Sequence, residues 1–203
     1  MSGFTEAYLS ALQSIAGNLD HGTIDAIAEE ILGVWQRRGV LYTAGNGGSA
    51  STASHFVCDI TKLTRVEGLM PIRAVCLSDN VAVHTAWSND TDYASALVNQ
   101  VEGLLSAADL VIVVSGSGNS PNVLKLAHYA RSVGCSTVGL VGYSGGKLAP
   151  LVGVPLIVPS GNMQLIEDMH LTICHVVASL VRSALEHYKR SDELVASADD
   201  FQA

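Results

Sequence analysis

The sequence predicts an α/β protein, with a parallel sheet of five strands between two layers of helices (a three-layer αβα arrangement). From residue 40 onward, short apolar segments alternate with segments of helical periodicity. The short segments contain runs of consecutive apolar residues rather than apolar residues at every second position, which is typical of parallel strands that helices cover on both faces. The expected strands are Val40–Thr43, Ile72–Leu77, Asp109–Ser115, Thr137–Val141 and Val154–Val158.

Helices are expected at both ends of the chain. Apolar side chains recur at helical spacing over residues 3–18 and 24–36. Thr23 is expected to cap the second of these helices and Gly39 to end it. The sequence leaves open whether the two helices pack on the domain or form an oligomer interface. A long helical segment, from Met163 to about Tyr188, closes the chain.

The length of 203 residues fits one domain with a core of ordinary size. We expect N-terminal helices over 1–39, an α/β core over 40–160, and a C-terminal helix and tail over 161–203. Only 15% of the residues are charged, against a usual share of about a quarter. This low share predicts that other copies of the chain cover part of the surface, as in a homo-oligomer.

The net charge of −8 argues against nucleic acid or an anionic membrane as a partner, because both need clustered Lys and Arg. A phosphorylated ligand is compatible with this charge, because backbone amides and hydroxyls bind phosphate. The four cysteines show no C-x-x-C spacing, which is typical of reduced thiols in an intracellular protein. Because the chain also has no apolar run of about 20 residues and no basic leader, we expect a cytoplasmic protein.

The loop after the first expected strand, Ala44–Ala50, carries three glycines and leads into a helix that begins at Ser49. Glycines let the backbone turn and approach a ligand closely, and the free N–H groups of a helix start favour an anion. The loop therefore predicts a phosphate site. It also fits the dinucleotide pattern G-x-G-x-x-A, but no acidic residue ends the second strand about 20 residues later, so a nicotinamide cofactor is not expected.

A second loop rich in glycine and serine, Ser115–Asn122, follows the third expected strand. Ser120 is a natural N-cap and Pro121 suits the first helical position, so hydroxyls and free amides gather at a helix start. Any tight turn between a strand and a helix could have this composition, but two such loops in one sheet favour phosphate binding. Ser117 lies between glycines, yet a hydrolase elbow needs glycine at position 115, so serine hydrolysis is not expected.

Histidines and carboxylates lie on the helix after the first loop and on the closing helix. His55 and Asp59 share one helix face, either as a solvated pair or as part of a site, and their nearness to the glycine loop favours the site. On the closing helix, Asp168 lies nearly in line with His175 and Glu167 about 80° away. Periodicity leaves open which carboxylate accompanies His175. His170, about 140° from His175, is expected to face packing or another subunit.

Together these residues resemble the sugar isomerase (SIS) domain family, most closely its phosphoheptose isomerase branch. The resemblance covers nearly the whole chain and implies a single SIS domain. It also implies a homotetramer that often holds zinc and that interconverts sedoheptulose 7-phosphate and an aldoheptose 7-phosphate. The motifs that carry it are Gly45–Ser49, Asn89–Asp90 with Tyr93, Ser115–Asn122, Gly145–Ala149, and Ile166–His170 with His175.

The resemblance also implies roles for individual residues. The phosphate ligands would be Ser115, Ser117 and Ser120, and the sugar ligands Asn46, Gly47, Ser49 and Asp90. The metal ligands would be His55, Asp59, Glu167 and His175, and the catalytic base and acid would come from Asp59, Glu167 and His175. This chain departs from the branch at three positions: Asp59 replaces a glutamate, Glu167 replaces a glutamine, and Gly116 replaces a threonine.

Two other functions fit the same sequence. A non-catalytic SIS protein would bind a phosphosugar or a protein partner. Such relatives tend to lose the acid and base residues, whereas this chain retains His55, Asp59 and His175. An isomerase of another ketose phosphate, such as a hexulose or octulose phosphate, would need the same residue types. An aldose–ketose isomerase requires a base, an acid and a group that stabilises developing negative charge, and this chain has candidates for each.

Overall fold

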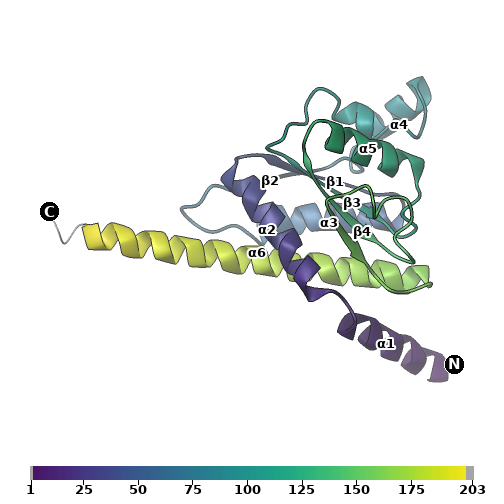
Figure 1. The fold of residues 1–203 in the computed structure, drawn as a ribbon, viewed down its shortest axis with the longest axis horizontal. Helices are drawn as coiled ribbons and strands as arrows, with labels where there is room; N and C mark the ends of the chain where they lie inside the picture. The colour runs from purple at the N-terminus through teal and green to yellow at the C-terminus, as the bar shows by residue number, and fades with distance from the viewer. Residues whose placement is uncertain (1, 200–203) are drawn as a thin grey trace.

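The computed structural model describes residues 2–199, and the side chains of residues 3–191. Its five strands form one parallel sheet in the order β2-β1-β3-β4-β5, so the predicted fold class is confirmed (Figure 1). The elements are α1 (Ser2–Gly17), α2 (His21–Gln36), β1 (Val40–Ala44), α3 (Gly48–Lys62), β2 (Arg73–Cys76), α4 (Val81–Asp90), the 3₁₀ turn η1 (Val98–Gln100), β3 (Leu110–Ser115), α5 (Pro121–Ser132), β4 (Ser136–Val141), β5 (Val154–Ile157) and α6 (Met163–Asp199).

The central strand β3 shows why the sheet is covered on both sides. Leu110, Ile112 and Val114 pack with side chains of α2, α3 and α6, whereas Val111 and Val113 pack with α5 and the segment around η1. All five are buried, and each contributes about 1.5–3 kcal/mol by leaving water. Figure 1 shows the resulting layers, with α5 on one side of the sheet and α2, α3 and α6 on the other.

All five strands were predicted to within one residue at each end, but the ends of α2 differ in detail. Its N-cap is Asp20, whose Oδ1 accepts from the backbone N–H of Thr23 at 3.2 Å; the prediction that Thr23 is the cap was wrong. Asp20 was missed because the helix begins at His21, three residues before Ile24, the first residue of the apolar pattern. At the other end, Arg38 takes a φ of 58° and the N–H of Gly39 donates to the carbonyl of Val34, which terminates the helix.

Two helical segments were not predicted in full. α4 was missed because its apolar residues do not gather on one face, and it has no buried residue among its described side chains. α6 continues to Asp199 instead of ending near Tyr188, and Figure 1 shows its C-terminal part running beyond the rest of the fold. The apolar periodicity fades there, but Lys, Arg, Glu, Leu and Ala are good helix formers.

The division into 1–39, 40–160 and 161–203 stays a prediction, and residues 1 and 200–203 of it lie outside the described part of the chain. None of the described helices is both long enough and apolar enough to cross a membrane.

Candidate active site

The two glycine-rich loops lie side by side at the carboxyl ends of β1 and β3. These strands are neighbours, with Ala44 opposite Val113, and the chain leaves them in opposite directions, to β2 and to β4. In open parallel sheets such a switch point opens the crevice in which ligands bind. The fold therefore brings together the two phosphate sites that the sequence predicted separately.

A cavity of about 270 Å³ lies between the two loops and the start of α6. Six of the seven predicted substrate residues line it; only Asp90 is not among the lining residues. A larger cavity, of about 540 Å³, lies beside the amino ends of β4 and β5, away from both loops. Because only the smaller cavity gathers the predicted side chains, we take it as the candidate site. Its lining includes Asn46, Gly47, Ser49, Ser115, Ser117 and Ser120.

The serine side chains of the cavity have hydroxyl hydrogens to offer. Ser115 Oγ accepts from the N–H of Gly118 at 3.2 Å, and Ser117 Oγ accepts from the N–H of Asn119 at 3.3 Å. The hydroxyl of Ser120 makes no hydrogen bond with any described residue. Hydroxyls that are free to donate, beside the starts of α3 and α5, form a suitable site for an anion.

Two glycines permit the loop geometry. Gly47 is the N-cap of α3 with a φ of 54°, a left-handed conformation that side chains disfavour. Gly118 has a φ of 63°, and a Cβ there would overlap the carbonyl of Gly145 in the loop after β4. The N–H of Leu148, in the same neighbouring loop, donates to the Gly118 carbonyl at 3.0 Å. The serine loop is therefore held in place by close backbone packing.

A cluster of two histidines and one carboxylate lies between α3 and α6. The Nε2 atoms of His55 and His175 are 2.9 Å apart, and Asp59 Oδ2 lies 3.4 Å from the first and 3.6 Å from the second. The histidine side chains are about half exposed and that of Asp59 is 20% exposed. Two imidazole nitrogens and one carboxylate oxygen facing one point are a donor set that suits zinc, with a position left for a ligand.

The two carboxylates that periodicity could not separate point different ways. Asp168 Oδ2 accepts from the hydroxyl of Tyr8 at 2.6 Å, so it ties α6 to α1. This hydrogen bond raises the pKa of Tyr8. Glu167 lines the cavity, and its carboxylate lies so close to Gly48 that a Cβ at Gly48 would overlap it. Of the two, Glu167 is therefore the candidate that accompanies His175.

Glu167 lies outside the three-residue cluster, although the sequence predicted it as a fourth metal ligand. The cluster found among the described residues contains only His55, Asp59 and His175, whose ligand atoms all lie within 4.8 Å of one another. Glu167 makes no hydrogen bond or ion pair with any described residue. Its carboxylate faces the start of α3, so its metal and catalytic roles stay predictions.

His170, which the sequence assigned to packing or to another subunit, is fully buried in the fold. Burial lowers its pKa to about 4, with an opposing contribution from the backbone of Val141. Neither ring nitrogen meets hydrogen-bond geometry with a described residue. A histidine that is neutral and away from solvent is a packing residue, so the expected packing role is confirmed.

Comparison with known proteins agrees with this geometry. A family model described as "SIS domain" matches residues 4–142. The phosphoheptose isomerase of Trichlorobacter lovleyi is 34% identical, covering 88% of this chain and 90% of its own, and that of Roseiflexus is 39% identical, covering 80% and 82%. The solved structure of the phosphoheptose isomerase from Neisseria gonorrhoeae has 29% identity and a TM-score of 0.80, covering 90% of this chain and 96% of that chain.

The chain belongs to the SIS domain family. Within that family it falls in the phosphoheptose isomerase branch, and it is an isomerase. The predicted resemblance, which rested on several short motifs, is therefore confirmed.

Two residues of this SIS domain occur in the family motifs but received no role from the sequence. Tyr93 donates from its hydroxyl to Asn46 Oδ1 at 2.7 Å, and Asn122 exchanges two hydrogen bonds with the Asn46 amide. Asn122 is fully buried, whereas Asp90, for which a role was predicted, is exposed at the end of α4 and accepts from Asn89. Pattern alone could not find this triad because its members lie far apart in the chain.

Proposed function

We propose that this protein interconverts sedoheptulose 7-phosphate and an aldoheptose 7-phosphate. The observation that carries the proposal is the shared cavity of the two loops, in which serine hydroxyls and free helix-start amides suit a phosphate. The choice of a heptose as the sugar rests on the relatives, which are named phosphoheptose isomerases. Binding the remote phosphate would also hold the sugar in register, so these loops would contribute to the rate as well as to affinity.

The proposed chemistry moves a proton between neighbouring carbons. A carboxylate, either Asp59 or Glu167, removes the proton from C1 of the ketose, while His175 gives a proton to the C2 carbonyl oxygen. The enediol that forms is then protonated at C2 as the C1 hydroxyl loses its proton and becomes the carbonyl. No oxidant is needed, because the substrate is oxidised at one carbon and reduced at the next. General acid–base catalysis of this kind contributes typically 10²–10⁴-fold.

We propose further that the histidine cluster holds one divalent metal ion, zinc being the best match for its donors. The ligands would be His55, Asp59 and His175, with Glu167 as the fourth candidate. The acid and the base would then act through a ring nitrogen and a carboxylate oxygen that are not bound to the ion. When bound, the ion would polarise the sugar carbonyl and stabilise negative charge on its oxygen. The fit rests on the nitrogen and oxygen atoms that already face one point.

A homotetramer is proposed as the assembled form. It is supported by α4, which has no buried residue among those described and which exposes Val81 (70%) and Trp87 (38%). Exposed apolar side chains on such a helix are expected to contact another copy of the chain. The measurement is sedimentation velocity, where a species of four chains is expected.

Turnover of a panel of ketose phosphates tests the proposed function. The purified protein is assayed with sedoheptulose 7-phosphate, fructose 6-phosphate and an octulose 8-phosphate, each with and without added zinc. We expect the highest kcat/KM with sedoheptulose 7-phosphate and a gain with zinc. A preference for another sugar would assign the chain to a different ketose phosphate, and turnover of none would favour a binding protein. The cluster of His55, Asp59 and His175 favours an enzyme over a binding protein.

A further inference from the structure

Asn122, the second residue of α5, forms a paired amide contact with Asn46 of the first loop. Asn46 Nδ2 donates to Asn122 Oδ1 at 2.9 Å, and Asn122 Nδ2 donates to Asn46 Oδ1 at 2.8 Å. Asn122 is fully buried and is not among the residues that line the cavity, whereas Asn46 lines it. Asn122 can therefore act on a ligand only through Asn46.

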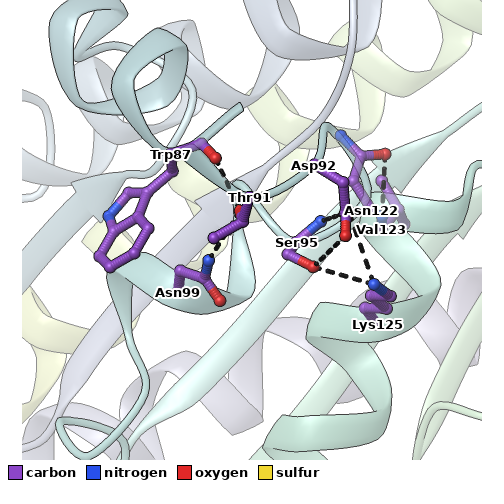
Figure 2. Close-up of polar contacts among 8 residues, drawn as sticks. All are labelled: Trp87, Thr91, Asp92, Ser95, Asn99, Asn122, Val123 and Lys125. Atoms are coloured by element: carbon purple, nitrogen blue, oxygen red, sulfur yellow. Dashed lines mark hydrogen bonds and ion pairs between the residues drawn. The ribbon is translucent and has the colours of Figure 1, made fainter. Parts of the chain in front are cut away.

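The backbone fixes which way round this pair is oriented. The N–H of Val123 donates to Asn122 Oδ1 at 3.0 Å, a contact drawn in Figure 2. This N–H belongs to the first turn of α5, where no helix carbonyl is available to it. As a donor, this N–H needs an acceptor, so Asn122 must present its oxygen there and its Nδ2 to Asn46. The amide orientation of Asn46 follows.

Tyr93 completes the arrangement from the other side. Its hydroxyl donates to Asn46 Oδ1 at 2.7 Å, so this oxygen accepts two hydrogen bonds and both of its lone pairs are used. One of the two Nδ2 hydrogens is bound to Asn122. The second Nδ2 hydrogen is the remaining hydrogen-bonding capacity of the Asn46 amide, so a ligand in the cavity meets a donor.

We propose that Asn122 is a positioning residue, which fixes the Asn46 amide as a hydrogen-bond donor to an oxygen of the bound sugar. The proposal rests on the proposed function for the identity of the sugar. The fixed amide makes the chain selective for a ligand with a hydrogen-bond acceptor facing Asn46 Nδ2. An asparagine free to rotate would present its carbonyl oxygen equally well.

Contacts between α5 and the segment that follows Tyr93 hold Asn122 and Tyr93 on their two sides of Asn46. Lys125, one turn along α5 from Asn122, donates to Ser95 Oγ at 2.9 Å and lies 3.5 Å from Asp92 Oδ1 (Figure 2). The N–H of Ser95 also donates to Asp92 Oδ1, at 2.7 Å. Both charged side chains are about half exposed, so the pair adds little stability by itself. These contacts tie the residues that follow Tyr93 in the chain to α5, which keeps Tyr93 near Asn46.

Asn122→Asp is the informative variant. It keeps an oxygen for the Val123 N–H and nearly the same shape, but an ionised carboxylate has no hydrogen to give Asn46. At pH 8 we expect kcat/KM for sedoheptulose 7-phosphate to fall about tenfold beyond any loss of affinity for inorganic phosphate. That loss measures separately how strongly the new charge repels a phosphate on the serine loop. At lower pH the protonated acid donates again, so the ratio of variant to wild-type kcat/KM should rise.

Other ionisable groups lie at or near the site, namely Glu167, Asp59, His55 and His175. They are common to both proteins, so the ratio at each pH cancels them. Gln100→Glu is the matched control, because Gln100 Nε2 donates to the Ala96 carbonyl away from the cavity. That variant should leave the ratio unchanged at every pH.

A double-mutant cycle separates positioning from general stability. In an Asn46→Ala background, Asn122→Asp should cause no further loss of kcat/KM beyond the change in phosphate affinity, because the residue through which it acts is gone. Tyr93→Phe should lower kcat/KM less than Asn122→Asp, because Asn122 still sets the amide. Multiplicative losses in the cycle, or a variant-to-wild-type ratio that does not change with pH, would overturn the proposal.

A measurement on the free protein keeps the inference separate from the proposed function. In NMR spectra of the wild type, the Asn46 side-chain amide, assigned by its loss in Asn46→Ala, should have one proton that exchanges slowly and one that exchanges fast. Equal exchange of both protons would refute the positioning role. Because this measurement uses the wild type, it tests the proposal even if Asn122→Asp does not fold. If the amide behaves as expected but sedoheptulose 7-phosphate neither binds nor reacts, only the proposed function fails.

Discussion

Replacing Glu167 by glutamine should change turnover and phosphate affinity in opposite directions. The two side chains have nearly the same shape, so the packing of residue 167 against Gly48 is kept and only charge and proton affinity change. If Glu167 is the base, kcat should fall about 10²–10⁴-fold. The substitution also removes a negative charge from a cavity that is proposed to hold a phosphate.

The size of the second effect follows from the cavity. The serine loop and Glu167 line one cavity of about 270 Å³, so a phosphate on the loop and the carboxylate would be separated by a distance on the order of 8 Å. At that distance the repulsion per unit charge is about 0.5–2 kcal/mol for a dielectric constant between 80 and 20. Inorganic phosphate should therefore bind about 2–30-fold more tightly to Glu167→Gln.

The assay combines turnover of sedoheptulose 7-phosphate with calorimetric titration of inorganic phosphate, at fixed metal content. Glu29→Gln, an exposed position on α2, is the control for a change in net charge and should alter neither quantity. Full turnover by Glu167→Gln would return the role of the base to Asp59. Unchanged phosphate affinity would mean that Glu167 does not face the phosphate.

Four further predictions concern the serine loop, its neighbour, the buried histidine and the metal cluster. Ser120→Ala should weaken sugar phosphate binding by about 1.5–3 kcal/mol with unchanged thermal stability, because the hydroxyl has no partner in the fold; an unchanged KM would contradict this. Gly116→Thr should lower kcat/KM because its Cβ would overlap the sulfur of Met163, and adding Met163→Ala should restore it; an additive loss would count against that contact. His170, with a pKa of about 4 when folded and about 6.5 when unfolded, should contribute stability that is complete above pH 6.5 and declines as the pH falls towards 4. About 2 kcal/mol should be lost between pH 7 and 5 in urea unfolding, and His170→Met should remove that part of the dependence. Elemental analysis should find about one divalent metal per chain, which His55→Ala should abolish; full activity of metal-free protein would exclude a metal role.

The strands and the two ligand loops could be predicted because their signals are local. A buried parallel strand such as β3 is apolar at each of five consecutive positions, Leu110–Val114, and a loop such as Ala44–Ala50 carries its three glycines within four residues. α4 could not be predicted, since its apolar residues do not gather on one face and none of its residues is buried. A helix that packs on little in its own chain leaves no periodic signal.

Some residues of the site could likewise be predicted from local patterns, and others needed the fold. His55 and Asp59 are one helical turn apart, so the sequence could pair them, and the parallel sheet then placed both loops at one end. The choice between Glu167 and Asp168 needed the fold, because it depends on the hydroxyl of Tyr8 about 160 residues away. Asn122 likewise gained its role from a contact with the first loop, which no local pattern encodes.

Proton exchange during turnover is the most direct test of the central claim. The protein is incubated with sedoheptulose 7-phosphate in D₂O, with zinc present, and the sugars are followed by NMR. Transfer by an acid and a base through an enediol predicts an aldoheptose 7-phosphate that carries deuterium at C2, and deuterium at C1 of the recovered ketose. Conversion without any deuterium in either sugar would contradict the acid–base mechanism, and no conversion at all would contradict the proposed substrate.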